Sequence, residues 1–347
     1  MIVHARALLS LEEEIREVSR EFGLRRPIEA EPIGRGSRLS AKSRLRCPDG
    51  QFMLKRRAPG AGTRERLDAL HAFQLHLSDA GVPVARLRRS PAGTTVVDGP
   101  LGTYEMFEWV DGERWSQRVV EAAAMGAALG SMLRASMDFA GGNGLGRFSY
   151  HRAGTFDVAL EPILGSISRA DPDTDIATLR GTLEVLMDRA RRAYLRVEQS
   201  GLDESPWLCV HGDTHPGNVI FDAGRVRAII DFDGVRSDHR VCEAANALVH
   251  FGNSPIAAVP QERWQAELDL RRIAALSGGL GHGMGMALVS QEREALPWLM
   301  IESCTLESIV PIARSGRFAH LRADGFLTFI ERKTAWIESN ARAIASA

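Results

Sequence analysis

The sequence predicts an α+β fold of two lobes, in which a five-stranded antiparallel sheet with one long helix precedes a mostly helical lobe. Up to residue 110, short apolar runs alternate with turn residues, which is typical of strands. Beyond residue 112, long segments carry apolar residues at helical spacing. Asp111-Gly112 separates the two patterns, so we predict lobes at 1–110 and 111–347. A chain of 347 residues is long enough to bury a full core.

The first lobe is predicted to begin with an amphipathic helix over 10–21, capped by Ser10. Strands are predicted at 28–33, 38–46, 51–57, 94–97 and 103–109. Between the third and fourth strands, Thr63 caps a helix that runs to about residue 80 and ends before Gly81. This lobe is therefore a sheet with a single long helix inserted among its strands.

The second lobe is predicted to be helical around a small β region. Helices are predicted at 117–137, 174–198, 239–251, 261–276, 286–309 and 324–341. Two glycine-rich segments, 143–146 and 277–285, are predicted to interrupt them. A short buried strand at 207–210 is followed by a hairpin, whose strands 219–221 and 226–230 flank a turn.

The formal net charge of −1 provides no global field that would favour nucleic acid or a membrane surface. The charge is uneven, with a net of +4 over 1–110, −5 over 111–233 and zero over 234–347. A basic first lobe would suit a polyphosphate, although scattered solvated charge explains the imbalance equally well. We therefore expect partners to be small molecules, not nucleic acids or membranes.

The cysteines and the N-terminal segment bear on the compartment. The four cysteines form no C-x-x-C pair, so the sequence indicates neither a zinc site nor a disulfide framework. The first residues lack an apolar signal core, and no run of about 18 apolar residues is present. We expect a cytoplasmic protein, as a monomer or homodimer.

The most informative segment runs from His211 to Asn218 and reads H-G-D-T-H-P-G-N, followed by I-I-D-F-D at 229–233. It places Asp213, Asn218 and Asp231 at fixed intervals along the chain. Phosphoryl transfer from ATP needs a carboxylate that orients the attacking hydroxyl, together with an amide and a second carboxylate that hold magnesium. The predicted hairpin would bring Asn218 and Asp231 to the same end. The sequence therefore predicts a phosphotransferase.

This loop resembles that of the aminoglycoside phosphotransferase and choline kinase-like superfamily, small-molecule kinases with the bilobal protein-kinase-like fold. The resemblance implies that Asp213 is the catalytic base or hydroxyl-orienting group, that Asn218 and Asp231 bind Mg²⁺, and that ATP is the co-substrate. His211 would tie the loop together. His215 would either do the same or contact phosphate or substrate, so both histidines are candidate site residues.

On the nucleotide side, Gly34, Gly36 and Ser37 lie in a turn whose backbone N–H groups could approach phosphates. Lys55 follows an apolar strand, at the position of the kinase phosphate lysine. Only 3 of the 43 basic residues are lysines, which makes this placement informative. By resemblance the nucleotide base meets the backbone of the hinge segment Phe107, Glu108 and Trp109.

The partner of Lys55 departs from the pattern. A glutamate is expected on the following helix about sixteen residues later, where the sequence has His71. Asp68 could reach the lysine, or His71 or Gln74 could orient it through a neutral hydrogen bond. The missing glutamate leaves open which residue orients Lys55.

The acceptor is expected among the C-terminal helices. Candidate residues are Glu243, Asn246, His250, Glu302 and Glu307. Glu243 also resembles the acidic residue that braces the catalytic loop in this superfamily, while a glutamate in a first helical turn can simply stabilise the helix dipole. The charge-neutral last third argues against a polycationic aminoglycoside.

We expect an ATP-dependent enzyme that phosphorylates a hydroxyl of a small molecule such as an antibiotic, amino alcohol or sugar. Two alternatives remain open, a bacterial protein kinase of the same fold and a non-catalytic nucleotide-binding regulator. Gly212 stands where protein kinases carry the arginine that pairs with a phosphorylated activation loop. Only a short segment separates Asp233 from the next predicted helix, which leaves little room for such a loop.

Overall fold

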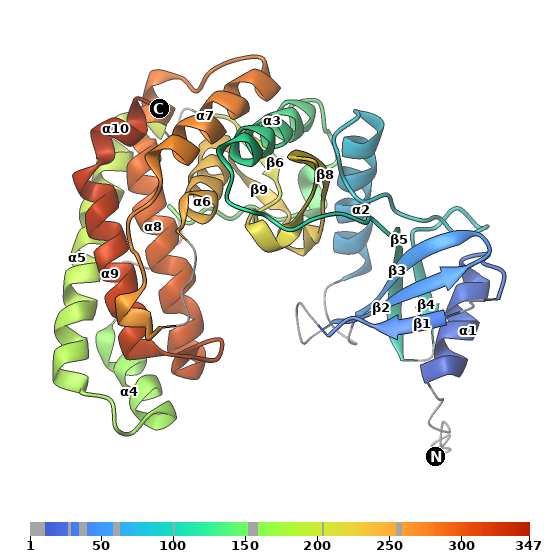
Figure 1. Ribbon diagram of the computed structural model, residues 1–347, viewed down its shortest axis with the longest axis horizontal. Coiled ribbons are helices and arrows are strands. Elements are labelled where there is room, and N and C mark those ends of the chain that lie inside the picture. Colours follow the sequence, from blue (N-terminus) through green and yellow to red (C-terminus); the bar gives the residue numbers. More distant parts are fainter. Residues whose placement is uncertain are drawn as a thin grey trace. The chain divides into compact units, whose positions relative to one another are not determined.

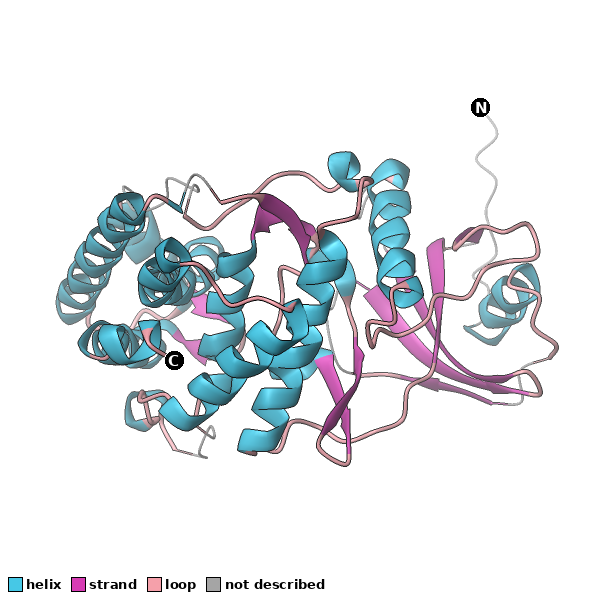
Figure 2. Cartoon of the chain, turned by 90° about the horizontal axis from the view of Figure 1, so that it is seen from above, coloured by secondary structure: helices cyan, strands magenta, loops and turns pink. Residues whose placement is uncertain are grey.

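The structure, a computed structural model, describes residues 11–26, 29–34, 40–57, 63–99, 101–151, 159–202, 205–254 and 259–347. The chain divides into two compact units. The first unit comprises Met1–Gly112, Phe139–Leu145 and Arg227–Ile230. The second comprises Glu113–Asp138, Gly146–Val226 and Asp231–Ala347. The main β-sheet belongs to the first unit and most of the helices belong to the second (Figure 2).

The first unit contains a five-stranded antiparallel sheet with the strand order β1-β2-β3-β5-β4 (Figure 1). Its strands are β1 (Glu29–Pro32), β2 (Ser40–Cys47), β3 (Gly50–Arg57), β4 (Val96–Gly99) and β5 (Gly102–Glu108), and its helices are α1 (Leu11–Glu21) and α2 (Arg64–Asp79). α1 contributes Val18 to a buried cluster with Leu45 and Met106 of the sheet. The predicted α+β fold and its five-stranded sheet are confirmed.

The second unit is helical around short β segments. Its helices are α3 (Val119–Ser136), α4 (Leu160–Ala170), α5 (Ile176–Ser200), α6 (Arg240–Gly252), α7 (Leu270–Met284), α8 (Ser290–Ser315), α9 (Ala323–Ser339) and α10 (Ala341–Ala345). The strands are β6 (Trp207–Val210), β7 (Val219–Asp222), β8 (Arg225–Ile229), β9 (Arg236–His239), β10 (Arg317–Phe318) and β11 (Leu321–Arg322). Arg227–Ile230, which holds the last three residues of β8 and the residue after it, clusters with the first unit.

Most predicted elements agree with the structure, and their caps explain why. The predicted cap Thr63 accepts a hydrogen bond from the Arg66 N–H at 3.2 Å, so α2 begins where the sequence places it. The predicted hairpin is present as β7 and β8. Ser10, predicted to cap the first helix, lies outside the described residues.

Two helix predictions in the second unit are wrong. The helix predicted over 261–276 begins too early, because residues 261–263 form a 3₁₀ turn and α7 begins at Leu270, after its cap Asp269. α7 then continues to Met284 through glycines that were predicted to interrupt the helices. α4 was not predicted.

The glycines of α7 are explained by close packing against α3. A Cβ at Gly279 would lie 2.2 Å from the carbonyl oxygen of Ala123, and one at Gly283 would lie 2.1 Å from that of Ala127. A side chain at either position would push the two backbones apart. Glycine therefore serves helix packing here, and the helix is stabilised by its partner despite a low intrinsic propensity.

α8 runs through the middle of the helical unit. Within the described part of the chain it is the helix that is long and apolar enough to cross a membrane by length and composition. However, 78% of its most apolar window is buried inside the structure, and α8 packs against α4, α5, α6 and α9. It thus has the surroundings of a core helix.

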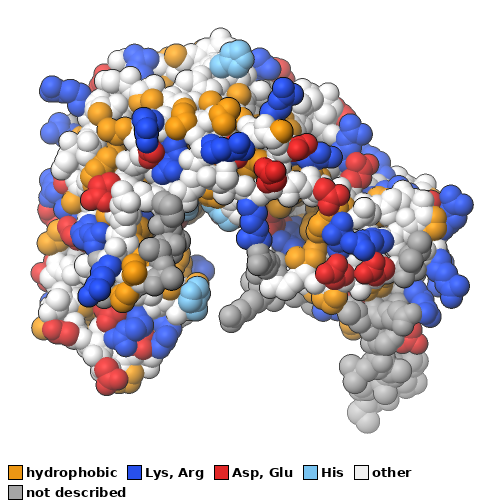
Figure 3. Space-filling view, viewed as in Figure 1, with side chains coloured by type: hydrophobic (Ala, Val, Ile, Leu, Met, Phe, Trp, Pro, Cys, Tyr) orange, Lys and Arg blue, Asp and Glu red, His pale blue; other side chains and the backbone are white. Residues whose placement is uncertain are grey.

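Charged side chains on the helices of the second unit pair with one another. Arg180 of α5 contacts Glu161 of α4 at 2.7 Å, and Arg192 contacts Glu338 of α9 at 3.2 Å. Lys and Arg side chains are interspersed with Asp and Glu on the face drawn in Figure 3. Exposed pairs of this kind contribute at most about 1 kcal/mol each, so the buried apolar faces hold these helices together.

Candidate active site

The candidate catalytic loop connects β6 to β7 and is shaped by Gly212. This residue has φ 75°, in the left-handed region that favours glycine. A Cβ there would lie 2.2 Å from the carbonyl oxygen of Gly234 and 2.3 Å from an Arg236 guanidinium nitrogen. Arg236 itself donates to the Gly212 carbonyl at 2.7 Å. The glycine of the H-G-D motif is therefore required by the packing of the loop.

Within this loop the structure brings Asp213 and Asn218 together. The Asn218 amide donates 3.0 Å hydrogen bonds to the carbonyl oxygen of Asp213 and to its carboxylate oxygen Oδ2. Asn218 is 7% exposed, whereas the side chain of Asp213 is 56% exposed. Because the amide nitrogen is used in this way, Oδ1 is the Asn218 atom suited to bind a cation. The carboxylate of Asp213 is thus fixed at one edge and accessible at the other.

The two histidines of the loop differ in their surroundings. His211 is fully buried, accepts a hydrogen bond from the Asp213 N–H at 3.3 Å, and packs edge-on against Phe232. His215 is 37% exposed and accepts from the Gly217 N–H at 3.0 Å. Its Nε2 lies 3.7 Å from an Asp213 carboxylate oxygen. His211 therefore shapes the loop from inside, while His215 lies beside the Asp213 carboxylate.

The electrostatic surroundings change the protonation of both groups. Removal from solvent raises the pKa of Asp213, and the neighbouring histidines and the Asn218 hydrogen bond oppose this effect. Removal from solvent also lowers the pKa of His215, partly offset by Asp213. His215 is therefore neutral at pH 7, and Asp213 is a stronger base than a fully solvated aspartate.

Glu243, in the first turn of α6, holds the loop through two hydrogen bonds. Its carboxylate accepts the Gly212 N–H at 2.9 Å and the Thr214 hydroxyl. The side chain is 1% exposed, so both oxygens are engaged within the protein. Of the two roles suggested by the sequence, this geometry supports bracing of the loop and leaves no free edge toward an acceptor.

Asp231 follows the hairpin and has φ 63°, a left-handed conformation that is uncommon for a non-glycine residue. Asn218 directly precedes β7 and Asp231 comes two residues after β8, so the pairing of these strands brings the two residues to the same end. An amide oxygen and a carboxylate are hard ligands, and Mg²⁺ is usually held by one or two carboxylates plus substrate phosphates and water. This donor set therefore fits magnesium.

A second polar cluster surrounds Glu307 of α8. The carboxylate accepts hydrogen bonds from the Tyr150 hydroxyl at 3.1 Å, from Asn246 of α6, and from Ser303 at 3.4 Å, and it lies 3.1 Å from Nε2 of His250. Burial alone would raise the pKa of Glu307, but these partners, His250 first, hold it below its usual range. Glu307 is thus an ionised carboxylate with 28% of its side chain exposed.

The Glu307 cluster adjoins the catalytic loop. The rings of His250 and His215 lie 5.9 Å apart, and the charge of Asp213 contributes to a raised pKa of Tyr150. By contrast Glu302, another predicted acceptor residue, is fully buried and lies 3.0 Å from His151. Among the acceptor candidates, Glu307 and His250 are therefore partly exposed to solvent and close to the candidate catalytic loop. Glu302 is buried, and an acceptor could not reach its carboxylate.

The nucleotide candidates lie in the first unit, and those near the hinge are constrained. The N–H groups of Glu108 and Trp109 donate to the carbonyls of Arg86 at 2.8 Å and Gln51 at 2.9 Å. These two N–H groups are therefore used within the unit and are not free for a nucleotide base. Phe107 is 8% exposed and belongs to the core. Gly34 is described, while Gly36 and Ser37 lie outside the described residues.

Lys55 is 2% exposed and lies opposite Glu105 in the register of β3 and β5. None of the three partners considered from the sequence supplies a carboxylate to it. Asp68 pairs with Arg64 at 3.1 Å, and Gln74 donates to the Ala85 carbonyl. His71 contacts Glu105 at 2.8 Å. Glu105 was missed, although an acidic residue within an apolar strand was the available signal.

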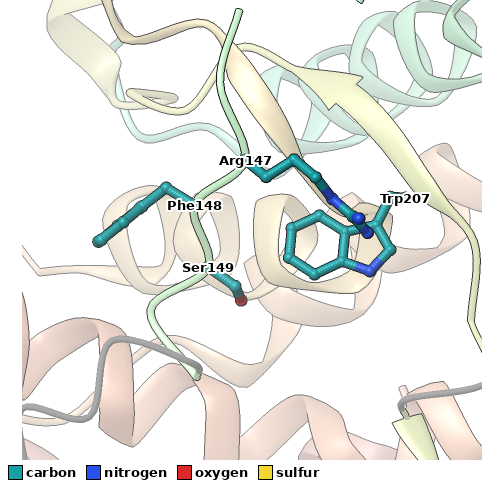
Figure 4. A pocket seen from close by; sticks show the side chains of 4 residues that line it. All are labelled: Arg147, Phe148, Ser149 and Trp207. Atoms are coloured by element: carbon teal, nitrogen blue, oxygen red, sulfur yellow. The ribbon is translucent and has the colours of Figure 1, made fainter. Parts of the chain in front are cut away.

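A surface pocket of about 320 Å³ lies elsewhere in the second unit, lined by Arg147, Phe148, Ser149 and Trp207. The Arg147 guanidinium stacks over the Trp207 ring at 4.2 Å, while Phe148 points away from that pair (Figure 4). Among the described residues that line this pocket there is no carboxylate. The catalytic loop, not this pocket, therefore defines the candidate active site.

The family model of the phosphotransferase enzyme family matches residues 29–276, which include the catalytic loop and the lysine strand. The chain belongs to this family. The chain is therefore a phosphotransferase. No sequence among the curated proteins matches the chain.

Solved structures of other phosphotransferases share the fold. A microcompartment-associated aminopropanol kinase is 13% identical, with a TM-score of 0.65 over 95% of this chain and 97% of its own. Choline kinase from Cryptosporidium parvum Iowa II is 13% identical, with a TM-score of 0.60 over 90% and 89%. The amicoumacin kinase hAmiN, in complex with AMP-PNP, Ca²⁺ and Ami, is 15% identical, with a TM-score of 0.58 over 88% and 89%. This phosphotransferase therefore has the predicted bilobal, protein-kinase-like fold.

Proposed function

We propose that this phosphotransferase transfers the γ-phosphoryl group of ATP to a hydroxyl of a small molecule. The observation that carries the proposal is the catalytic loop, in which Asn218 holds an exposed Asp213 carboxylate in place. In the proposed reaction Asp213 accepts a hydrogen bond from the acceptor hydroxyl, orients its oxygen toward the γ-phosphorus, and takes up its proton as the new P–O bond forms. The bond between the γ-phosphorus and the β,γ-bridging oxygen breaks at the same time, and ADP leaves with that oxygen.

The remaining roles follow from the donor atoms that the chain provides. Asn218 Oδ1 and Asp231 would hold Mg²⁺, which neutralises charge on the phosphate oxygens when it is bound. Lys55 would pair with phosphate oxygens of ATP as a point charge. The acceptor would lie against Asp213 and the cluster of Tyr150, Asn246, His250 and Glu307. The ionised Glu307 in this cluster favours an acceptor that carries a basic nitrogen as well as a hydroxyl.

Two observations bear on the alternatives. The segment between Asp233 and α6 holds only the end of a 3₁₀ turn and β9, which supports a small acceptor over a protein substrate. The main support for the non-catalytic alternative is the missing glutamate on the helix after Lys55. Glu105, opposite Lys55 in the sheet, weakens that argument.

The test is ADP release with magnesium and ATP against a panel of aminoglycosides, homoserine, choline, thioribose and hexosamines. We expect acceptor-dependent release that falls by orders of magnitude in Asp213→Ala, with nucleotide binding retained. Asp222→Asn, an exposed aspartate at the end of β7, is the matched control and should retain turnover. Equal turnover in Asp213→Ala and the parent protein would refute the role of Asp213.

A further inference from the structure

The lysine strand carries a buried charge network that the sequence pattern does not contain. Lys55 and Arg57 of β3 lie opposite Glu105 and Thr103 of β5, in an antiparallel register. Glu105 is fully buried, and Lys55 and Arg57 are 2% and 7% exposed. A buried carboxylate is costly unless it is paired and hydrogen-bonded, so its partners determine where it lies.

Both oxygens of Glu105 are engaged. Arg57 donates to both of them, at 3.3 Å to Oε2 and by a closer contact to Oε1. His71 Nε2 lies 2.8 Å from Oε2. Burial alone would raise the pKa of Glu105, but the His71 hydrogen bond and the charges of Lys55 and Arg57 lower it to about 2. Glu105 is therefore ionised at neutral pH and lies opposite Lys55.

The role of His71 follows from its hydrogen bonds. A carboxylate only accepts hydrogen bonds, so His71 Nε2 must carry the proton that it shares with Glu105. Its Nδ1 lies 2.7 Å from the Thr95 hydroxyl, which can donate to it. A neutral imidazole thus satisfies both contacts. Figure 1 shows α2, which carries His71, beside β3 and β5.

We propose that Glu105 is the positioning residue for the phosphate-binding Lys55, and that His71 orients Glu105 from the helix position where a glutamate was expected. The carboxylate thus lies on strand β5 instead of on helix α2. The helix supplies the neutral hydrogen-bond donor His71 at the position where a glutamate was expected. This inference rests on the proposed function, because it assigns a partner to the lysine that would bind ATP.

The arrangement has a consequence for nucleotide binding. Lys55, Arg57 and Glu105 carry a net charge of +1, so the charge of Glu105 does not cancel the positive field that attracts phosphate. A helix can move relative to a sheet, but a cross-strand pair is fixed by the ladder of backbone hydrogen bonds. We therefore expect Lys55 to be positioned before ATP binds.

The experiment compares Glu105→Gln, His71→Glu and the double variant Glu105→Gln/His71→Glu with the parent chain. Calorimetric titration with ADP and magnesium gives the Kd of each, steady-state assays give kcat and the KM for ATP, and thermal unfolding reports folding. Loss of one charge-assisted hydrogen bond corresponds to a roughly 10- to 100-fold weaker Kd and higher KM for ATP. We expect that loss in Glu105→Gln.

The double variant separates positioning from folding. Because His71→Glu returns a carboxylate to the helix, it should recover at least about tenfold in Kd over Glu105→Gln alone. A merely structural role for Glu105 would not be rescued in this way. Asp68→Asn, on the exposed face of the same helix, is the matched control and should retain the parent Kd.

The proposal is overturned if folded Glu105→Gln binds ADP as tightly as the parent, or if the second substitution recovers nothing. Failure of the proposed function gives a different result. In that case the parent chain itself shows no acceptor-dependent ADP release, whereas the effect of Glu105→Gln is still read from the Kd for ADP.

Discussion

The catalytic loop and the lysine network are built in opposite ways. In the loop, the key contacts of Asp213 are made within the run from His211 to Asn218. In the network, Lys55, His71, Thr95 and Glu105 come from β3, α2, the segment before β4, and β5. The loop is therefore visible as a motif in the sequence, whereas the network appears only when the sheet is formed.

This difference explains why the candidate catalytic loop can be recognised in the sequence and the lysine network cannot. A local motif constrains residues whose spacing the backbone fixes directly. A network across strands requires only that a carboxylate lies near the lysine. That carboxylate can come from a helix or from a strand. Substitutions and a change of pH test this contrast between the loop and the lysine network, from the largest expected effect to the smallest.

Gly212→Ala should distort the backbone of the candidate catalytic loop. The substitution adds left-handed strain of about 1–2 kcal/mol and places a methyl group against the Gly234 carbonyl, so the backbone carrying Asp213 must shift. Since a displacement of about 1 Å can cost 100-fold in rate, kcat should fall by at least about 100-fold. Steady-state kinetics and calorimetric nucleotide titration should show this loss with little change in the Kd for ATP.

Gly201→Ala is the matched control for this change. Gly201 has the same φ of 75°, but nothing lies within 4 Å of an added Cβ. It should lose only the strain energy and retain turnover. If Gly212→Ala kept more than a tenth of the parent kcat, the close packing of the loop would not matter for catalysis.

Acid should weaken the lysine network through Glu105. Its pKa is about 2 in the folded protein against a usual value of 4.5, so its stabilising contribution is fully present above pH 4.5 and is lost as the pH falls toward 2. The difference corresponds to roughly 3 kcal/mol. Denaturant unfolding at pH 5, 4 and 3 should show a shallower pH dependence for Glu105→Gln than for the parent.

The control for the acid experiment is Glu161→Gln. Glu161 also has a lowered pKa, through its hydrogen bond from Arg180, but it lies at an exposed surface. Its substitution should leave the parent pH dependence almost unchanged. Identical curves for Glu105→Gln and the parent would show that Glu105 is not held as a buried anion.

Glu243→Gln should loosen the loop without touching the reactive groups. A glutamine has one acceptor oxygen for the Gly212 N–H, and its amide can meet the Thr214 hydroxyl only as a donor, so both charge-assisted bonds to the carboxylate become neutral ones. The weakening of these two buried hydrogen bonds costs about 2 kcal/mol in the free energy of unfolding, and kcat should fall about tenfold. Chemical denaturation and steady-state kinetics would measure the two effects.

Glu292→Gln makes the same chemical change elsewhere. Glu292 is buried at the start of α8 and pairs with Arg240 at 2.6 Å. It should lose comparable stability but keep the parent kcat. Equal losses of kcat in both variants would mean that Glu243 acts only through overall stability.

Thr95→Val should have the smallest effect, and it sharpens the assignment of His71. The substitution removes the hydroxyl that lies 2.7 Å from His71 Nδ1 while keeping the side-chain shape. We expect a loss of about 1 kcal/mol in the free energy of unfolding and a few-fold rise in the KM for ATP. Thr94→Val, whose hydroxyl bonds to Ser90, should leave the KM unchanged. A KM equal to the parent in Thr95→Val would argue against the neutral histidine.

Much of the fold was predictable because it follows from local signals. The apolar periodicity and the Thr63 cap predicted α2, and the turn residues predicted the hairpin of β7 and β8. The failures have a common cause. β9 (Arg236–His239) is four polar residues that form a strand because β6 pairs with it, and α7 keeps its glycines because α3 packs against them.

The sequence by itself determined which residues are candidates for the phosphoryl-transfer chemistry, since Asp213, Asn218 and Asp231 lie at a recognisable spacing along one short stretch. Only the tertiary structure decided that Glu243 braces the loop, that Glu307 lies beside it, and that Glu105 lies beside Lys55. Glu105 and Lys55 are fifty residues apart in the sequence. The register of β3 against β5 brings them together, and that register is set by the packing of the whole sheet rather than by either segment.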